Sequence, residues 1–520
     1  MPLPKKIPGF AHFKSHLWLG LLFFLFGLVP VCWPVYSDDQ NMYLLHGLVS
    51  GGYGLFKRDW LVFTADPMPL FSGLIALTYR YLPEFFFYLY QIAFAGLYFA
   101  GLVGITAKTT GIAKSHTAFR AYLAVLAAVH SYLLYKISYV FFGQNIFFLL
   151  TRGVSGVFLL GPVFQPGAFA SLFLLSIYEY LSRRVFRAVF LLAAAAVFHP
   201  AYLFTAAALT ASYMVLEVIE NQEWQRAFWL GLFALTLILP AVLYLCFVFA
   251  PASAEMMQQA QSILIHERMG PYLDYRQWFL SWSAAFKMAW MILAIALVPS
   301  FRLRVIMGVM LAAGAAFTVL HLMTGSGYLA LIMPWRVSAL LMPVSTSVLI
   351  AVFLRQIIVL RRLNKITRRG IERISLVVFF FLIAAGAGKT LYASFAGNRM
   401  PADYLKMQDY VKTHHTEEDL YLLPPDLRYQ DFRLQTRASI FVSFKTHPYK
   451  DVEVLEWYKR VQLANDFYGY QTHLNCQKLD ALKQRYGITH VIFSGPFDAP
   501  CESLEPEYRE GRYAILKLKN

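Results

Sequence analysis

Residues 17–39 read LWLGLLFFLFGLVPVCWPVYSDD, a long apolar run that ends in two adjacent aspartates. The run is longer than the apolar region of a typical signal peptide and has no small-x-small cleavage site, so we interpret it as an uncleaved first membrane span. A pair of carboxylates is costly close to hydrocarbon, and for that reason Asp38 and Asp39 predict a functional site. We place that site on the outer face of the bilayer, where a lipid-linked substrate can reach it.

The composition extends this reading to most of the chain. Of its 520 residues, 58% are hydrophobic and 15% are charged, whereas soluble domains usually carry about 25% charged residues. The recurring apolar runs predict a polytopic all-α membrane bundle of about eleven transmembrane helices. The predicted spans are 17–35, 84–106, 119–135, 167–181, 186–198, 201–217, 227–250, 283–300, 304–322, 336–354 and 374–394.

Two of the apolar segments are not expected to span the membrane as simple helices. The run 186–198 is too short for a full span and ends at His199-Pro200, which predicts a broken helix. Segment 137–166 is apolar but contains Arg152 and several glycines and prolines. We expect it to re-enter the membrane or to lie along the interface.

The net charge of +16 has a topological explanation. Basic residues gather in short loops between spans, which is the pattern that sets membrane orientation, and it favours contact with anionic lipid over nucleic acid. These loops are 5–14, 108–120, 183–187, 302–304 and 355–373. We therefore expect a multi-pass protein of the bacterial cytoplasmic (inner) membrane, with its N-terminus in the cytoplasm and everything after about residue 395 outside.

The last part of the chain, 397–520, predicts a separate α/β domain in the periplasm. Its patterns indicate helices at 403–413 and 452–465 and strands at 419–423, 438–444, 490–494 and 513–517. Cys476 and Cys501 both lie in this part, so they are expected to form a disulfide if it faces an oxidising compartment.

The first outside loop, 36–83, concentrates acidic residues. Asp38 could simply cap the helix predicted at 40–49. Capping does not account for the second aspartate beside it, nor for Asp59 and Asp66 farther along the same loop.

The loop also carries the features of a known family. An acidic pair just after the first span, a helix that ends at Gly51-Gly52, and a proline-bearing segment before PLFSGLIAL (69–77) resemble the GT-C superfamily of integral-membrane glycosyltransferases. The resemblance implies a GT-C-like transmembrane domain over 1–396 and an outside domain over 397–520. It also implies a polyprenyl-phosphate sugar as donor and inversion of the anomeric centre.

The chemistry of sugar transfer assigns provisional roles. A base must take the proton of the acceptor hydroxyl, and cations or a metal must hold the negative charge that grows on the leaving phosphate. The resemblance implies that Asp38 or Asp39 is the base, and we favour Asp39. Asp38 would then cap the helix and orient the carboxylate of Asp39. Asp39 and Asp66 would be the ligands of a divalent cation, Mg²⁺ or Mn²⁺, which the sequence permits without requiring.

Further substrate-binding candidates come from charged residues in outside-facing segments. Each has a structural alternative: a solvated loop, a headgroup anchor or a histidine bonded to a backbone carbonyl. These candidates are Asp66, Arg336, Arg268, His266, Glu267, Lys57, Arg58, His199 and Arg152. In the tail, 432–449 places Arg433, Arg437, Lys445 and His447 around a predicted strand. They could face the substrate, but we favour a solvated strand edge.

The sequence therefore predicts a membrane glycosyltransferase that adds a sugar to a lipid-linked glycan or envelope acceptor on the outer face of the cytoplasmic membrane. Three alternatives stay open: a transporter or flippase, suggested by the break at His199-Pro200; a polysaccharide polymerase or ligase, which would use outside arginines; and a catalytically silent scaffold. No zinc-hydrolase, Walker or serine-hydrolase motif occurs in the sequence.

Overall fold

The computed structural model describes residues 16–143, 145–273, 279–360, 364–396, 400–469, 475–495 and 501–519. The basic stretch 5–14 and part of the one at 355–373 lie outside these residues. The chain forms two compact units. Unit 1 comprises Met1–Trp33, Tyr88–Leu243 and Met269–Phe395, and unit 2 comprises Pro34–Phe87, Tyr244–Arg268 and Ala396–Asn520.

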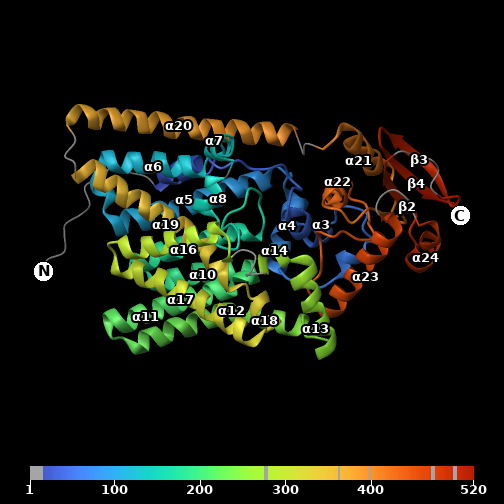
Figure 1. Ribbon diagram of the computed structural model, residues 1–520, viewed down its shortest axis with the longest axis horizontal. Helices are drawn as coiled ribbons and strands as arrows, with labels where there is room; N and C mark the ends of the chain where they lie inside the picture. Colours follow the sequence, from blue (N-terminus) through green and yellow to red (C-terminus); the bar gives the residue numbers. More distant parts are fainter. Residues whose placement is uncertain are drawn as a thin grey trace. The chain divides into compact units, whose positions relative to one another are not determined.

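Unit 1 is built from helices (Figure 1). Its α-helices are α1 (His16–Phe26), α5 (Phe86–Thr110), α6 (His116–His130), α7 (Tyr132–Phe142), α8 (Ile146–Thr151), α9 (Ser171–Leu181), α10 (Val185–Phe198), α11 (Leu203–Asn221), α12 (Trp224–Val248), α14 (Gly270–Leu273), α16 (Trp282–Leu297), α17 (Phe301–Thr324), α18 (Gly327–Leu331), α19 (Val337–Arg355) and α20 (Lys365–Ala396). Short turns of helix complete it: η2 (Ile112–Lys114), η3 (Pro166–Ala170), η4 (Pro200–Tyr202), η6 (Pro334–Arg336) and η7 (Gln356–Leu360).

Six helices in the described residues are long and apolar enough to cross a membrane, or seven if the bent pair α6 and α7 counts as one span. The predicted number of about eleven is therefore not confirmed. The break between α6 and α7 bends the chain by 65°, and α7 and α8 are short, as expected of a segment that does not span simply. Helix α10 has 14 residues and ends at Phe198, directly before His199-Pro200, as predicted.

The first predicted span, 17–35, is wrong as a single helix. Helix α1 ends at Phe26 after 11 residues. Gly27 then packs so closely on α5 that a Cβ there would lie 2.2 Å from the carbonyl oxygen of Ile92. Pro30 and Pro34 follow, and neither has a backbone N–H to continue a helix.

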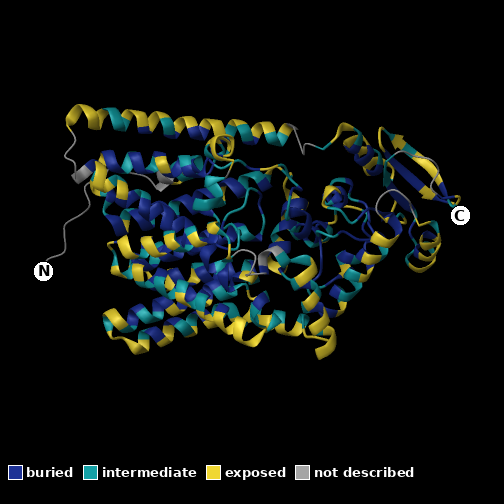
Figure 2. Cartoon of the chain, viewed as in Figure 1, coloured by how far each residue is buried: buried dark blue, intermediate teal, exposed yellow. Residues whose placement is uncertain are grey.

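In contrast to α20, which is exposed along much of its length (Figure 2), helix α19 is the most enclosed of the candidate spans. The 18-residue apolar stretch of the span Gly327–Ile358, which contains α19, is 78% buried, compared with 6% for the corresponding stretch of α12. Small polar side chains allow neighbouring helices to approach α19 closely and to form hydrogen bonds with it. The hydroxyl of Ser347 is hydrogen-bonded to that of Thr106 at 2.7 Å and to that of Tyr122 at 2.6 Å. The N-terminal end of α19, which follows Arg336, is thus fixed within unit 1.

Unit 2 combines short helices with a small sheet (Figure 1). The helical elements are α2 (Gln40–Tyr43), α3 (Leu45–Ser50), η1 (Trp60–Phe63), α4 (Pro69–Tyr81), α13 (Ala254–Ser262), η5 (Ile263–Arg268), α21 (Ala402–His414), η8 (Leu427–Tyr429), α22 (Phe432–Thr436), α23 (Asp451–Tyr468) and α24 (Cys476–Tyr486). The strands are β1 (Tyr421–Leu422), β2 (His490–Ser494), β3 (Leu504–Glu510) and β4 (Tyr513–Leu518), in the order β1-β2-β4-β3. β1 runs parallel to β2, and the other neighbours are antiparallel.

The predicted strand at 438–444 is wrong, and the reason lies in the first loop. Ala438 and Ile440 form only isolated bridges, to Leu55 and Tyr421. The backbone N–H of Ile440 donates to the carboxylate of Asp59 at 3.1 Å. This segment makes one bridge to the loop of residues 34–87 and one to β1, so it forms no continuous ladder in the sheet. The loop and the C-terminal residues belong to one compact unit.

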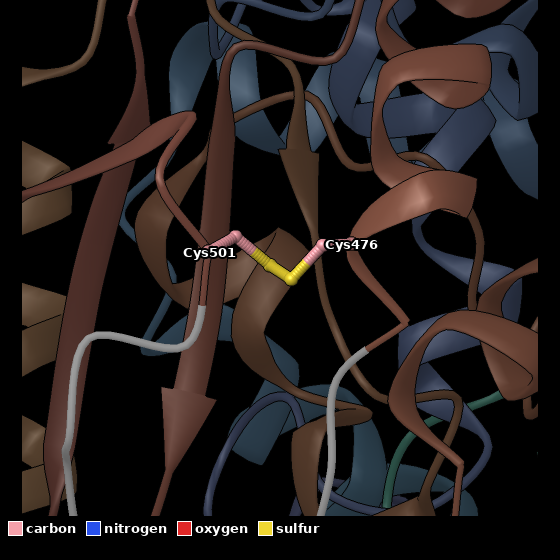
Figure 3. Close-up of a disulfide and its surroundings, with 2 residues drawn as sticks. All are labelled: Cys476 and Cys501. Atoms are coloured by element: carbon pink, nitrogen blue, oxygen red, sulfur yellow. A yellow bond between two sulfur atoms is a disulfide. The ribbon is translucent and has the colours of Figure 1, made fainter.

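The disulfide expectation is confirmed. Cys476, at the start of α24, is bonded to Cys501, which precedes β3 (Figure 3). The bridge closes a loop with a sequence separation of 25 residues.

Candidate active site

The two aspartates of the first loop share one lysine. The ammonium nitrogen of Lys445 lies 2.6 Å from Oδ1 of Asp39 and 3.1 Å from Oδ1 of Asp38. The lysine side chain is 16% exposed, whereas Asp38 and Asp39 are 41% and 37% exposed. The second oxygen of each carboxylate makes no hydrogen bond within the described residues, so the cluster carries excess negative charge and remains accessible.

The backbone around the pair is held in an unusual turn. Asp38 has a φ of +51° and Tyr36 a φ of +66°, in the left-handed region that residues other than glycine rarely adopt. The buried side chain of Asn41 donates to the carbonyl oxygens of Tyr36 at 2.7 Å and of Asp38 at 3.3 Å. Backbone outliers of this kind occur mostly at functional sites, where the surroundings hold them in place.

The expectation that Asp38 caps a helix is wrong. The residue at the N-cap of α2 is Asp39, and its side chain makes no capping hydrogen bond. Both carboxylates instead pair with Lys445. Capping therefore does not explain why two aspartates stand here.

Lys445 is held from both sides. Its carbonyl oxygen accepts a hydrogen bond from the guanidinium of Arg268 at 2.8 Å, and the hydroxyl of Thr446 donates to the carbonyl oxygen of Asn41 at 3.4 Å. Burial lowers the pKa of Lys445, but the charges of Asp39 and Asp38 act in the opposite direction and raise it overall. The lysine is therefore a fixed, protonated partner of the acidic pair.

His447 is neutral and buried beside this cluster, with 5% of its surface exposed. Burial, followed by the positive charge of Arg268, lowers its pKa to about 3. Arg268 donates from Nε to Nδ1 of His447 at 3.2 Å, so the neutral ring carries its proton on Nε2. That nitrogen is buried without a hydrogen-bond partner.

Unit 2 holds a cavity lined by residues that are close in sequence to the acidic pair and to Lys445, although neither aspartate lines it. It has an empty volume of about 380 Å³, part of it open to solvent. Met42 and Tyr43 line it from the turn after Asp39, and Thr446 and His447 line it from the residues after Lys445. His447, whose Nε2 has no hydrogen-bond partner, is therefore one of the residues that line this cavity.

Asp66 lines the same cavity, together with His46. Its Oδ1 accepts from the backbone N–H of Met68 at 2.9 Å, and its carbonyl oxygen accepts from the hydroxyl of Tyr244 at 2.7 Å. Burial lowers the pKa of His46, although the charge of Asp66 partly opposes this. Asp66 thus shapes the cavity from the second half of the first loop.

The other charged candidates in unit 2 lie apart from this cluster. Lys57 pairs with the exposed Glu418 at 2.6 Å, and Arg58 donates to the carbonyl oxygen of Glu418 at 2.9 Å. His266 and Glu267 are exposed, and no hydrogen bond joins either to the described residues around Asp38 and Asp39. Of the cations predicted in this unit, Lys445 contacts the acidic pair directly, and Arg268 contacts Lys445 and His447.

Unit 1 holds a separate cationic site at Arg336. The guanidinium donates to Nε2 of His199 at 3.3 Å and lies 5.5 Å from the centre of the Tyr202 ring. Its Nε is buried without a partner, and no carboxylate among the residues that the structure describes pairs with it. Arg336 also lines a cavity of about 370 Å³ with His321 and Ser155. An arginine with spare donors at a cavity is suited to binding an anion.

Two more cations lie on elements that meet the start of α19. The guanidinium of Arg152 is stacked between the rings of Phe148 and Phe158, at 3.4 and 3.8 Å. Lys287, which is 4% exposed, donates to the carbonyl oxygen of Gly153 at 3.0 Å. The next residue, Val154, bonds the side chain of Ser338 at 2.8 Å, only two positions after Arg336.

Sequence reasoning missed the parts that Lys445 and Lys287 play. The preference for a solvated strand edge at 432–449 is wrong, because Arg433 and His447 are buried and Lys445 pairs with the acidic residues. The sequence offered one signal for Lys445: segment 432–449 is rich in cations, and the first outside loop is rich in aspartates. Lys287 offered a second signal, a charge inside an apolar run.

A divalent ion fits the acidic pair poorly. Such ions take about six oxygen ligands at short distances. Within the described ranges, no group of three or more His, Cys, Asp or Glu side chains is arranged to hold a metal ion. Of the metal ligands named from the sequence, Asp39 has one oxygen engaged by Lys445, and Asp66 has one oxygen engaged by the Met68 N–H.

Comparison with known proteins adds little. Residues 402–464, which contain Lys445 and His447, match the family model of a domain of unknown function, DUF6798. No curated protein matches the chain. The fold is similar to the crystal structure of ArnT from Cupriavidus metallidurans bound to undecaprenyl phosphate, with 13% sequence identity and a TM-score of 0.42 over 96% of this chain and 97% of that chain. A likeness this distant does not indicate a function, so we infer the function from the chemistry of the site.

Proposed function

We propose that this protein is a membrane glycosyltransferase that transfers a sugar from a polyprenyl-phosphate donor to a lipid-linked glycan or envelope acceptor on the outer face of the cytoplasmic membrane. The observation that carries the proposal is the accessible carboxylate pair, Asp38 and Asp39, which helix capping does not explain and which shares a single lysine. Two carboxylates facing one lysine leave a net negative charge, so one of them can accept a proton.

In the proposed reaction the acceptor hydroxyl attacks the anomeric carbon of the donor sugar. The bond between that carbon and the phosphate oxygen breaks, and polyprenyl phosphate leaves with the electron pair. The acceptor proton passes to the carboxylate of Asp39, our preferred base. Attack opposite the leaving phosphate inverts the anomeric centre.

The leaving phosphate needs positive charge, and unit 1 offers it. Arg336 has unused donors and no carboxylate partner among the described residues. Arg152 and Lys287 stand on segments that meet the first turn of α19, whose N-terminus adds the positive end of a helix dipole. We propose that these groups bind the donor phosphate, with His199 orienting Arg336.

The other roles predicted from the sequence are either part of this proposal or stay predictions. The cavity beside Asp66 and His447 would receive part of a sugar, whose hydroxyls suit the free Nε2 donor. Contact of Lys57, Arg58, His266 or Glu267 with the substrate stays a prediction. The cytoplasmic N-terminus, the periplasmic placement of 397–520 and the requirement for Mg²⁺ or Mn²⁺ stay predictions as well.

The test is formation of a new glycosidic bond by the purified full-length protein in nanodiscs. A panel of polyprenyl-phosphate sugars is incubated with lipid extract from the host envelope, and products are identified by mass spectrometry. The double variant Asp38→Asn/Asp39→Asn should form no product. Asp409→Asn, the same chemical change at an exposed position of α21, is the matched control and should behave as wild type. Normal transfer by the double variant would refute the proposal.

A transporter is the second candidate, because helix α10 breaks at His199 and the break contacts Arg336. Discontinuous helices with charged residues are common at transport sites. Proteoliposomes loaded with a fluorescent polyprenyl-phosphate lipid separate the two functions. Movement of the lipid between leaflets without any new glycosidic bond would favour the transporter.

A further inference from the structure

Lys445 occupies the position that a metal ion would need. Its ammonium nitrogen approaches one oxygen of each aspartate, at 2.6 Å for Asp39 and 3.1 Å for Asp38. Two neighbouring carboxylates repel each other, and a cation between them removes most of that repulsion. In many sites of this kind a divalent ion performs the task, but here a side chain of the protein itself is in place.

The lysine is built into the fold and is not a mobile surface group. Its carbonyl oxygen is fixed by Arg268, and the neighbouring Ser443 accepts a hydrogen bond from the indole of the buried Trp457 at 2.9 Å. Thr446 ties the following residue to Asn41 in the turn that carries the aspartates. The backbone on both sides of Lys445 is therefore anchored, which fixes the point from which its side chain reaches the aspartates.

The charge balance also favours an ammonium group. One lysine against two carboxylates leaves a net charge of −1, so a base remains. A divalent ion on the same two groups would cancel the charge and hold both carboxylates as ligands, which need lone pairs for the metal. The described residues supply no third His, Cys, Asp or Glu ligand.

We propose that the ammonium group of Lys445 is the resident cation of the Asp38–Asp39 pair, so that the sugar transfer proposed above needs no divalent ion at these carboxylates. Only the statement that sugar transfer needs no divalent ion at these carboxylates rests on the proposed function. The statement about which cation the carboxylates hold is independent of any reaction. Lys445 acts through the aspartates, and it is accordingly a positioning residue.

The first experiment measures Mn²⁺ binding and needs no substrate. Full-length protein is titrated with Mn²⁺, and free Mn²⁺ is followed by electron paramagnetic resonance. Wild type should show no binding that depends on Asp39. Lys445→Ala should gain one Mn²⁺ site that wild type lacks, with the two carboxylates and water as its ligands, and the added change Asp39→Asn should remove it. Lys412→Ala, an exposed lysine of α21, is the control and should match wild type.

Two results of that titration overturn the inference. One is Mn²⁺ binding by wild type that Asp38→Asn or Asp39→Asn abolishes. The other is a folded Lys445→Ala protein, monodisperse and with a normal melting temperature, that gains no site. If Lys445→Ala does not fold, Lys445→Gln replaces it, and the wild-type titration decides the question in either case.

The second experiment measures transfer with and without EDTA. Wild type should be unaffected, Lys445→Ala should be slowed by about 10- to 100-fold and recover with Mn²⁺, and Lys445→Arg should retain more activity without metal. Loss of wild-type activity in EDTA that Mn²⁺ restores would overturn the inference. If no protein transfers sugar although Mn²⁺ binds as expected, the proposed function fails and the assignment of the cation stands.

Discussion

Two of the ion pairs that join the first loop to the C-terminal residues within unit 2 differ in burial, in charge balance and in hydrogen bonding. Asp59 and Arg433 are 0% and 3% exposed, with Nε of the arginine 2.7 Å from the carboxylate. Asp59 also accepts from the N–H groups of Leu61 and Ile440, at 3.1 Å each. Asp38 and Asp39 are each more than one-third exposed and share a single lysine. Neither carboxylate accepts a hydrogen bond from a backbone N–H of the described residues.

The difference shows how a buried carboxylate and a site carboxylate are distinguished. Each oxygen of Asp59 has a partner, so the group can be buried and holds the fold together. Asp38 and Asp39 each have an oxygen to spare and sit on a strained turn. The first pair should therefore govern stability, and the second should govern reaction.

The largest stability effect is expected at the buried pair. Asp59→Asn leaves Arg433 charged, buried and without its counter-ion, which should destabilise the protein by about 3–5 kcal/mol. Differential scanning fluorimetry of the protein in nanodiscs measures the change. The double variant Asp59→Asn/Arg433→Met should recover part of the loss. A melting temperature equal to wild type in Asp59→Asn would show that the pair does not hold the loop.

A smaller, pH-dependent effect is expected at His447. Its folded pKa of about 3 lies below the ordinary 6.5, so the unfolded chain binds a proton first as pH falls. The stabilisation is complete above pH 6.5 and is lost toward pH 3. Between pH 7 and pH 5 wild type should lose about 2 kcal/mol more than His447→Gln. The exposed His414→Gln is the control, and equal pH profiles for wild type and His447→Gln would contradict burial of the neutral ring.

The smallest effect is expected at an exposed pair. Lys406 and Glu510 lie 2.7 Å apart, with side chains 62% and 33% exposed. Solvent screens such pairs, so Lys406→Met should change the free energy of unfolding by less than about 1 kcal/mol. A shift comparable to that of Asp59→Asn would mean that exposure is a poor guide to the role of an ion pair in this unit.

The sequence predicted what depends on local pattern. Apolar runs located helices such as α5, α12 and α17, and alternation located β2 with its observed bounds. Helix α21 and the disulfide were also predicted. The helices and β2 follow from periodicity over a few residues, whereas the disulfide was predicted from the position of both cysteines in the outside domain.

The remainder depends on contacts across most of the chain. Arg433 is 374 positions from Asp59, and Lys445 is 407 positions from Asp38. Nothing in 438–444 indicates that a distant loop will bind its N–H groups, so the segment was predicted as a strand. The acidic pair could be singled out from the sequence, but the lysine that it shares could not.

The most direct test compares the two pairs in one assay: sugar transfer per folded molecule for Asp39→Asn and Asp59→Asn, alongside their melting temperatures. The account predicts that Asp39→Asn melts near wild type and loses about 100- to 10,000-fold in rate. It predicts that Asp59→Asn melts lower but keeps the wild-type rate among the molecules that remain folded. An unstable Asp39→Asn protein with normal transfer, or a stable Asp59→Asn protein without transfer, would contradict it.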